Sequence, residues 1–282
     1  MVVGVIRRLL DALKKFGSTA LAVPGPGGGP GRTSGPPTSS NAASSFHLYW
    51  DVPPVGLAEV GATIEVTEPP TVERLYFWAL QANFVTSNGA RLGGAHFGLQ
   101  YHPAYPGGGA VNWGGYNASG AELDGSVSDL PSTLDNINTS DYRWASGRLY
   151  RYRIYRSPER GWRGSITDLE TGMETVVRDL YIGGNRDAGN RDQIVSPMVW
   201  TECFAHCEEA PSAVRWTDLT ATDLNGTVHT VDAVRINYQT QTDGGCANTN
   251  ISTSDGTPAG WEQRTATERL QPTGAKLSIP KP

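Results

Sequence analysis

A single carboxylic acid in a tryptophan-containing run is the first candidate for chemistry in this sequence. Glu202 lies in VWTECFAHCE and alternates with Trp200 and His206. A glycosidase needs two carboxyl groups, about 5–10 Å apart, to act as acid and as base or nucleophile. Glu208 and Glu209 come after this run, and we interpret them as solvated loop charges. Glu202 is therefore an alternative catalytic residue without an evident partner.

A second candidate is the triplet Gln100-Tyr101-His102, which has the Gln-x-His form used in polysaccharide lyases. In such a reaction a His or Tyr removes the proton beside a uronate carboxylate, while Gln and Arg neutralise that carboxylate. The matching arginine-rich strand and second tyrosine motif are absent here, and His102 precedes Pro103 at a strand end. The sequence also lacks a G-x-S-x-G nucleophile motif and a phosphate-binding loop. His102 is therefore kept as a second alternative.

Glycan binding without catalysis requires less than either reaction. An aromatic side chain stacks on the sugar and polar groups bind its hydroxyls. We assign this role to five residues that alternate out of phase with the expected core positions Phe97, Leu99 and Val199: His96, Gln100, Trp113, Trp200 and Glu202. The alternative for each tryptophan is a place in the core.

Three cysteines allow at most one intramolecular disulfide. We favour Cys207–Cys246 and expect Cys203 to be a buried free thiol. The pair Cys203 and Cys207 with His206 lacks a second set of zinc ligands, so no metal site is assigned. No cofactor is expected. A structural calcium ion on the Asp and Asn residues of 183–192 is an alternative to a simple polar turn.

Short β-rich runs separated by Gly, Asn, Asp and Pro must position these side chains. No helical pattern interrupts them after residue 46, which predicts an all-β sandwich or barrel in one domain, 46–282. The stretch 118–144 is expected to be an edge excursion or a lid. Strands are predicted near 46–51, 61–66, 72–84, 94–101, 109–116, 148–156, 161–168, 173–180, 196–206, 213–222, 228–239 and 275–279.

The N-terminal part differs from this domain in composition. Residues 2–16 carry the only strong helical pattern, with a basic face, and residues 17–45 are rich in Gly, Pro and Ser. We expect a short amphipathic helix over 1–16 and a disordered, flexible linker over 17–45. The helix could bind a membrane surface, dock on the domain, or belong to a targeting segment.

Composition narrows the classes of function. The 282 residues carry a net charge of −5, so general nucleic-acid binding through basic patches is not expected. No apolar run reaches the 18 residues of a membrane-spanning helix. Eight tryptophans argue for a folded core rather than a disordered chain.

The run GWRGSITDLETGMETVVRDLYI, 161–182, resembles a hairpin of the concanavalin A-like lectin/glucanase jelly rolls. The order of YFWALQANF, GGAHFGLQYH, AVNWGGYN, VWTECFAHCE and NYQTQTDGGCANTN is similar to an uncharacterised bacterial family of secreted jelly-roll domains. This resemblance covers about 46–280. It implies a jelly-roll β-sandwich of two antiparallel sheets and carbohydrate recognition, and it supplies no catalytic residues.

Our hypothesis is therefore a domain that binds extracellular or cell-envelope glycans of a bacterium, with binding favoured over catalysis. A glycoside hydrolase or lyase, and a structural or protein-interaction β-sandwich, are the alternatives.

Overall fold

A computed structural model of the chain describes residues 32–184 and 192–279. This part consists of strands and two short 3-10 segments, η1 (Pro106–Gly108) and η2 (Ile182–Gly184), without an α-helix. The strand pairings found in it are all antiparallel. The all-β prediction is thus confirmed. The helix expected over 1–16, and its membrane-surface role through residues 2–16, lie outside the described residues.

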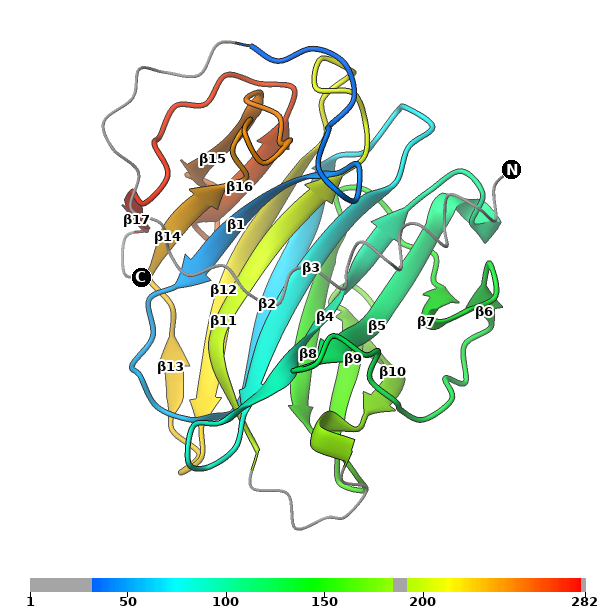
Figure 1. Cartoon of the computed structure of the whole chain (residues 1–282), viewed down its shortest axis with the longest axis vertical. Helices are drawn as coiled ribbons and strands as arrows, with labels where there is room; N and C mark the ends of the chain where they lie inside the picture. Colours follow the sequence, from blue (N-terminus) through cyan, green and yellow to red (C-terminus); the bar gives the residue numbers. More distant parts are fainter. Residues whose placement is uncertain (1–31, 185–191, 280–282) are drawn as a thin grey trace.

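The strands pair in two runs, which Figure 1 shows as a front and a back layer. The front run begins at the C-terminal strand and ends at a small edge hairpin. In order of pairing it contains β17 (Lys276–Ser278), β14 (Ala233–Tyr238), β1 (Ser44–Trp50), β11 (Gln193–Cys203), β3 (Tyr76–Val85), β4 (Arg91–Tyr101), β5 (Gly109–Asn117), β7 (Asn136–Asp141) and β6 (Ser132–Thr133).

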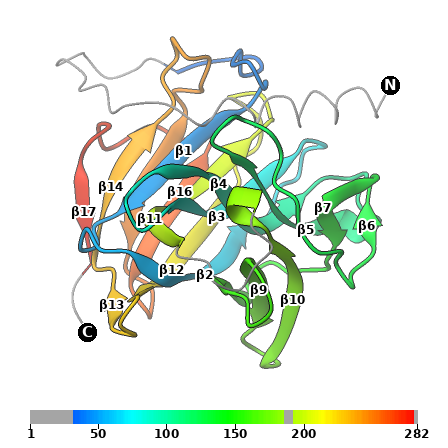
Figure 2. The same ribbon diagram turned by 60° about the horizontal axis from the view of Figure 1, so that its bottom comes forward.

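The back run has its own continuous order, with a short strand β13 (Val228–Thr230) pairing on the far end of β12. It contains β15 (Thr249–Ser254), β16 (Gly260–Thr265), β12 (Ala213–Asp223), β2 (Leu57–Glu68), β8 (Leu149–Arg156), β9 (Trp162–Asp168) and β10 (Met173–Leu180). One register pair, Ile194↔Leu57, joins the two runs into a single curled sheet. Figure 2 shows the same curl from below.

The main core fills the space between the two runs. Period-2 alternation on the front strands sends Phe97 and Leu99 inward, where they meet Tyr152 of β8. The rings of Phe97 and Tyr152 lie 5.3 Å apart, and the Leu99 N–H donates a 2.8 Å hydrogen bond to the Tyr152 hydroxyl. The residues that alternate with these inward positions point away from the core and form the outer face of the front run.

The N-terminal boundary of the β structure differs from the expected one. Residues 32–43, here called the strap, pack on the fold rather than forming part of a free linker. The Thr38 N–H donates to the Gly244 carbonyl at 2.9 Å, and the Gly35 carbonyl accepts from the Cys207 N–H at 2.9 Å. The linker assigned to 17–45 is therefore too long at its C-terminal end. Backbone hydrogen bonds to distant segments hold the strap in place. Amino-acid composition does not indicate such long-range bonds, so it could not predict that the strap is ordered.

The stretch expected to be an excursion or a lid, 118–144, contains the hairpin β6–β7. Strand β7 pairs with β5 and extends the front run at its edge. In the described ranges, 32–184 and 192–279, no helix has the length and apolar character that crossing a membrane requires. Within the same ranges no three His, Cys, Asp or Glu side chains gather as a metal-binding group. The calcium alternative at 183–192 falls mostly on residues 185–191, outside the described residues.

Candidate active site

The outer face of the front run carries a row of side chains in direct cross-strand register. Glu202 of β11 pairs with Phe77 of β3, and Phe77 pairs with Gln100 of β4. Directly paired residues point to the same face of a sheet. Glu202 and Gln100 therefore lie on one face, two strand spacings or about 10 Å apart at their backbones, with Phe77 between them.

Glu202 is a buried acid without a cationic partner. Only 2% of the residue is exposed, and among the described residues burial and the Asn41 hydrogen bond, but no cation, shift its pKa. The strap residue Asn41 donates from Nδ2 to Oε1 of Glu202 at 2.8 Å. Burial raises the pKa of Glu202 to about 7, and the Asn41 hydrogen bond lowers it by a smaller amount. The carboxyl group therefore exchanges a proton near neutral pH, as a general acid or base must.

Gln100 is held so that its amide nitrogen remains a donor. The Tyr105 hydroxyl donates to Oε1 of Gln100 at 2.8 Å. The Trp144 indole nitrogen donates to the Gln100 backbone carbonyl at 2.9 Å. Because Oε1 is already engaged, the orientation of the carboxamide is fixed, and Nε2 can donate to an oxygen that approaches the outer face.

An aromatic cluster covers the outer face next to this row. The Trp200 ring lies 5.2 Å from Phe77, 6.0 Å from His96 and 5.9 Å from His47. Burial lowers the pKa of both His47 and His96 to about 4. Both imidazoles are therefore neutral at neutral pH, and neither supplies a positive charge to Glu202.

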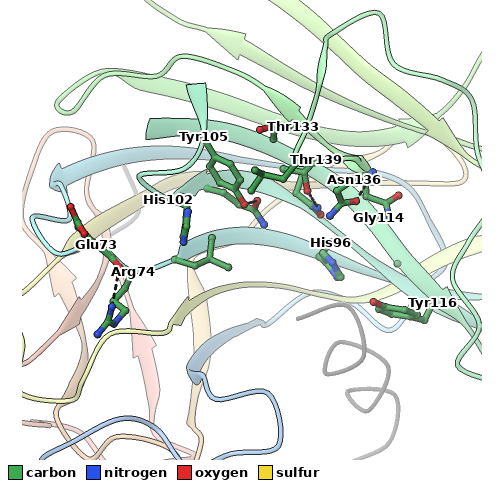
Figure 3. A pocket seen from close by; sticks show the side chains of 16 residues that line it. Glu73, Arg74, His96, His102, Tyr105, Gly114, Tyr116, Thr133, Asn136 and Thr139 are labelled. Carbon is green, nitrogen blue, oxygen red and sulfur yellow. Dashed lines mark hydrogen bonds between the residues drawn. The ribbon is translucent and has the colours of Figure 1, made fainter. Parts of the chain in front are cut away.

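A cavity of about 190 Å³ opens on the same face beside Gln100, toward β5 and β7. Figure 3 shows His96, Tyr105 and Thr139 around it. His102 also lines this cavity, and its Nδ1 accepts a 3.1 Å hydrogen bond from the Ala104 N–H. Partial burial lowers the pKa of His102.

The structure brings together four of the five residues assigned to a glycan platform. His96, Gln100, Trp200 and Glu202 share the outer face. Trp113 is the exception, because it pairs directly with Phe97 and points into the core with 0% exposure. Its Nε1 donates to the Trp162 carbonyl at 3.2 Å. Placing Trp113 on the ligand face was therefore wrong, and Trp200, only 5% exposed, does not form an open platform either.

Sequence reasoning missed Asn41 and Asn112. Asn41 was taken as linker, although it holds Glu202. Asn112 is 5% exposed, pairs with Gly98, and so lies on the outer face in the Gly-rich strand β5. The alternation Asn112, Gly114 against Val111, Trp113 was available as a signal, since it places the large apolar residues on the opposite face.

The cysteine assignment is confirmed. Cys207 and Cys246 form a disulfide with a Cα–Cα distance of 5.4 Å, and Cys203 is a buried free thiol. Disulfides persist in oxidising compartments, so this bond is consistent with an extracellular location.

Comparisons with known proteins find similarity to solved structures only. No family model matches the chain, and no curated protein matches it. Among solved structures, scytalido-glutamic peptidase with a peptide-based transition-state analogue is 10% identical, covering 83% of this chain and 99% of that chain at a TM-score of 0.40. SCP-B, a member of the eqolisin family of peptidases, in complex with a tripeptide, is 10% identical with the same coverage and a TM-score of 0.39. Alginate lyase Aly36B is 10% identical over 64% of this chain and 71% of that chain, at a TM-score of 0.27.

The structure corrects the hypothesis of glycan binding without catalysis. The aromatic platform that motivated the hypothesis is missing, because Trp113 is in the core and Trp200 is only 5% exposed. The preference for a non-enzyme is corrected with it, because the outer face carries a buried carboxyl group, and burial raises the pKa of this group to about 7, as in many catalytic sites. The β-rich fold stands, whereas the specific likeness to concanavalin A does not.

Proposed function

We propose that this chain is a hydrolase of peptide bonds in which Glu202 transfers the proton and Gln100 stabilises the developing oxyanion. The observation that carries the proposal is the Glu202 carboxyl group, buried, without a cation, and with its pKa raised to about 7. An acid or base of that pKa is effective near neutral pH in both directions of proton transfer.

The reaction follows from the two groups. Ionised Glu202 takes a proton from water as the water oxygen bonds to the peptide carbonyl carbon. The carbonyl oxygen gains negative charge and accepts a hydrogen bond from Nε2 of Gln100. Glu202, now protonated, gives its proton to the amine as the C–N bond breaks. One water is consumed, and the products are a carboxylic acid and an amine.

The position of the two groups favours a carbonyl substrate over a glycoside. Glycoside hydrolysis requires a second carboxyl group about 5–10 Å from the first. The described row contains Ser45, Phe77 and Gln100 beside Glu202, and a carboxamide occupies the place where a second acid would be needed. A carboxamide donor suits an oxyanion, whereas it cannot act as nucleophile or base.

A digest of a mixed peptide library, read by mass spectrometry, tests this proposal. Wild-type protein should cleave peptides, and Glu202→Gln should cleave them about 100- to 10,000-fold more slowly because proton transfer is lost. Gln100→Leu should lose about 100- to 1,000-fold. Glu262→Gln, which changes a half-buried glutamate in the back run, serves as the matched control and should retain the wild-type rate. No cleavage by the wild type, or unchanged cleavage by Glu202→Gln, would refute the proposal.

A second candidate is β-elimination on a uronate polymer, and the lining of the cavity favours it. Gln100, His102, Tyr105 and Arg74 all border this one cavity, which is the set of groups that such a lyase uses. Against it, Tyr105 already donates to Gln100, and burial raises the pKa of that hydroxyl. An absorbance assay for unsaturated uronate product decides the question. His102→Ala should abolish any such product, whereas peptide cleavage should survive that change.

The finer fold assignment remains part of the proposal. The two runs, the core between them and their antiparallel pairing support a jelly-roll β-sandwich. The Cys207–Cys246 disulfide supports a site of action in the cell envelope or outside the cell.

A further inference from the structure

Asn41 engages one of the two carboxyl oxygens of Glu202 and leaves the other open. Its Nδ2 donates to Oε1 at 2.8 Å. Oε2 forms no hydrogen bond with a described residue, and it does not belong to the buried polar atoms that lack both a partner and contact with solvent. Oε2 therefore keeps contact with solvent, within the 2% of Glu202 that is exposed. A water molecule or a substrate on the outer face reaches the carboxyl group at this oxygen.

A backbone N–H fixes the direction of the Asn41 amide. The Ala43 N–H donates to Oδ1 of Asn41 at 3.3 Å, and the Ser39 hydroxyl donates to the same oxygen at 2.8 Å. Because a backbone N–H can only donate, the atom that faces it is the amide oxygen, and Nδ2 faces Glu202. Oε1 of Glu202 therefore accepts a hydrogen bond whether the carboxyl group is ionised or protonated. A proton bound to this group has to be on Oε2.

The strap turn, residues 39–43, has a counterpart in the loop between β3 and β4, residues 86–90. There the Ala90 N–H donates to the Thr86 hydroxyl at 3.0 Å and to Oδ1 of Asn88 at 3.4 Å. The strap turn contains the same two hydrogen bonds. The surroundings of the two turns differ, because Asn88 is exposed, whereas the asparagine of the strap turn is buried against a carboxyl group.

The strap turn holds a strained backbone conformation that suits its counterpart better. Ala42 has a φ of 59°, in the left-handed region, where the counterpart has Gly89 with a φ of 84°. A residue with a Cβ is strained in that region, and such strain persists only where the surrounding contacts fix the backbone. A contact that distinguishes the strap turn from its counterpart is the hydrogen bond from Asn41 to Glu202.

Within the described ranges, the strands packed against Glu202 bring no further charge to it. Strand β1 places Ser45 opposite it, and strand β3 places Phe77. Two titratable neighbours, Cys203 of β11 and His47 of β1, are uncharged at neutral pH. Burial raises the pKa of Cys203 to about 12 and lowers the pKa of His47 to about 4. The hydrogen bond from the strap is therefore the polar contact that controls this carboxyl group.

We propose that Oε2 of Glu202 both takes and returns the proton during peptide hydrolysis, and that Asn41 is a positioning residue that assigns this task by engaging Oε1. The proposal rests on the proposed peptidase function. Oε2 takes a proton from the attacking water as the water oxygen bonds to the carbonyl carbon. The same oxygen gives this proton to the amine nitrogen as the C–N bond breaks. Asn41 touches neither the water nor the substrate and acts through the carboxyl group.

Asn41→Asp replaces the donor with an acid and keeps the turn, because the Ala43 N–H can still donate to a carboxylate oxygen. Carboxyl-carbon NMR of the full chain, labelled in glutamate, follows the titration of Glu202, whose signal is identified by its loss in Glu202→Gln. The midpoint should rise by about 1–3 pH units, because two carboxyl groups in contact do not both ionise readily. Asn88→Asp, the same change in the counterpart turn, is the matched control. It should leave the midpoint within about 0.2 pH unit of wild type, since solvent and salt screen an exposed charge.

The side-chain amide of Asn41 provides a second readout in the wild type. If Nδ2 donates to Oε1, one of its N–H signals should shift with the same midpoint as the carboxyl carbon of Glu202. Should Asn41→Asp fail to fold, Asn41→Ala takes its place with a smaller upward shift, because it removes the donor without adding a charge. In a cleavage assay at pH 7, kcat of Asn41→Asp should fall about 10-fold with KM nearly unchanged, since a smaller fraction of Glu202 is ionised.

The NMR results decide the proposal without relying on turnover. A midpoint in Asn41→Asp that stays with the control, or an Asn41 N–H signal that does not follow the titration of Glu202, would overturn it. A raised midpoint together with an N–H signal that follows the titration supports it. If both are observed and the wild type cleaves no peptide, the peptidase function fails, while Oε2 remains the oxygen that carries the proton.

Discussion

At the scale of the residue, Glu202 couples folding to proton binding. Its pKa is raised to about 7 in the folded state by burial, against about 4.5 when exposed. Between these two values the folded chain binds more protons at this site than the unfolded chain. The contribution of Glu202 to stability is therefore present below pH 4.5 and is lost as pH rises toward 7.

Replacing this acid with a neutral isostere should remove that dependence. We expect the free energy of unfolding of wild type, relative to Glu202→Gln, to fall by about 3 kcal/mol between pH 4.5 and pH 7. His47 and His96 titrate in both proteins, so their effect cancels in the difference. Urea unfolding of both proteins at several pH values measures it. A difference that stays constant with pH would show that Glu202 is not buried as described.

The reassignment of Trp113 makes a second residue-scale prediction. Its ring packs 5.9 Å from Phe97 in the core and touches no part of the outer face. Trp113→Ala should lower the free energy of unfolding by about 3–5 kcal/mol, because it opens a large cavity. Denaturant titration checks this, with Val127→Ala, an exposed apolar truncation, as the comparison. A change below 1 kcal/mol would mean that Trp113 does not belong to the core.

Alternation within single strands could predict much of the site, but not all of it. Gln100 and His96 alternate against Phe97 and Leu99 on β4, which predicts their shared outer face. Alternation on β5 likewise sets Trp113 opposite Asn112, but which of the two faces is the outer one follows from the register between β4 and β5. Cross-strand register depends on contacts between segments far apart in the chain, which alternation within one strand does not reveal.

At the scale of the element, the strap and the disulfide act together on Glu202. The Cys207–Cys246 bond ties the end of β11 to the segment that follows β14. Thr38 of the strap pairs with Gly244 beside that bond. The strap in turn carries Asn41 onto Glu202. The Asn41–Glu202 hydrogen bond is therefore connected, through the strap, to a disulfide that lies just beyond the end of β11.

Removing this link should loosen the strap. A Cys207→Ala, Cys246→Ala double variant should lose about 4 kcal/mol of stability, since the bond closes a loop with a sequence separation of 39 residues. Amide hydrogen exchange at Thr38 should also accelerate. Calorimetry and exchange measured by mass spectrometry report these two effects. Unchanged amide hydrogen exchange in the strap would show that the order of the strap does not depend on the disulfide.

Two strands were not predicted from the sequence, because many of their side chains are polar. Strands β15 and β16 read TNISTS and GWEQRT, which do not follow an apolar alternation. Gln263 of β16 is nevertheless 1% exposed and accepts from Trp216 at 2.7 Å. Its amide donates to the Phe46 carbonyl at 2.7 Å, which joins the back run to the front run. A buried amide whose hydrogen bonds are formed can be part of the core, although its polar character predicts a place at the surface.

At the scale of the whole molecule, the curled sheet separates two tasks between its faces. The inner face of the front run packs against the back run and stabilises the fold. The outer face then carries Glu202, Gln100 and the cavity on paired, rigid strands. Sequence predicted the all-β class and most strands, because glycine- and asparagine-bounded β runs are local signals. It did not predict the proposed activity, because the acid and the amide come from strands about 100 residues apart in the chain.

The dependence of kcat/KM on pH for wild-type cleavage of a single peptide tests the central claim most directly, because kcat/KM reports ionisations of the free protein. If ionised Glu202 is the general base, kcat/KM should rise with pH through one ionisation whose midpoint lies near 7. Asn41→Ala removes the hydrogen bond that lowers this pKa, so its midpoint should move to higher pH. A rate that is flat across neutral pH, or a midpoint that Asn41→Ala leaves unchanged, would contradict the assignment of Glu202 as the group that transfers the proton.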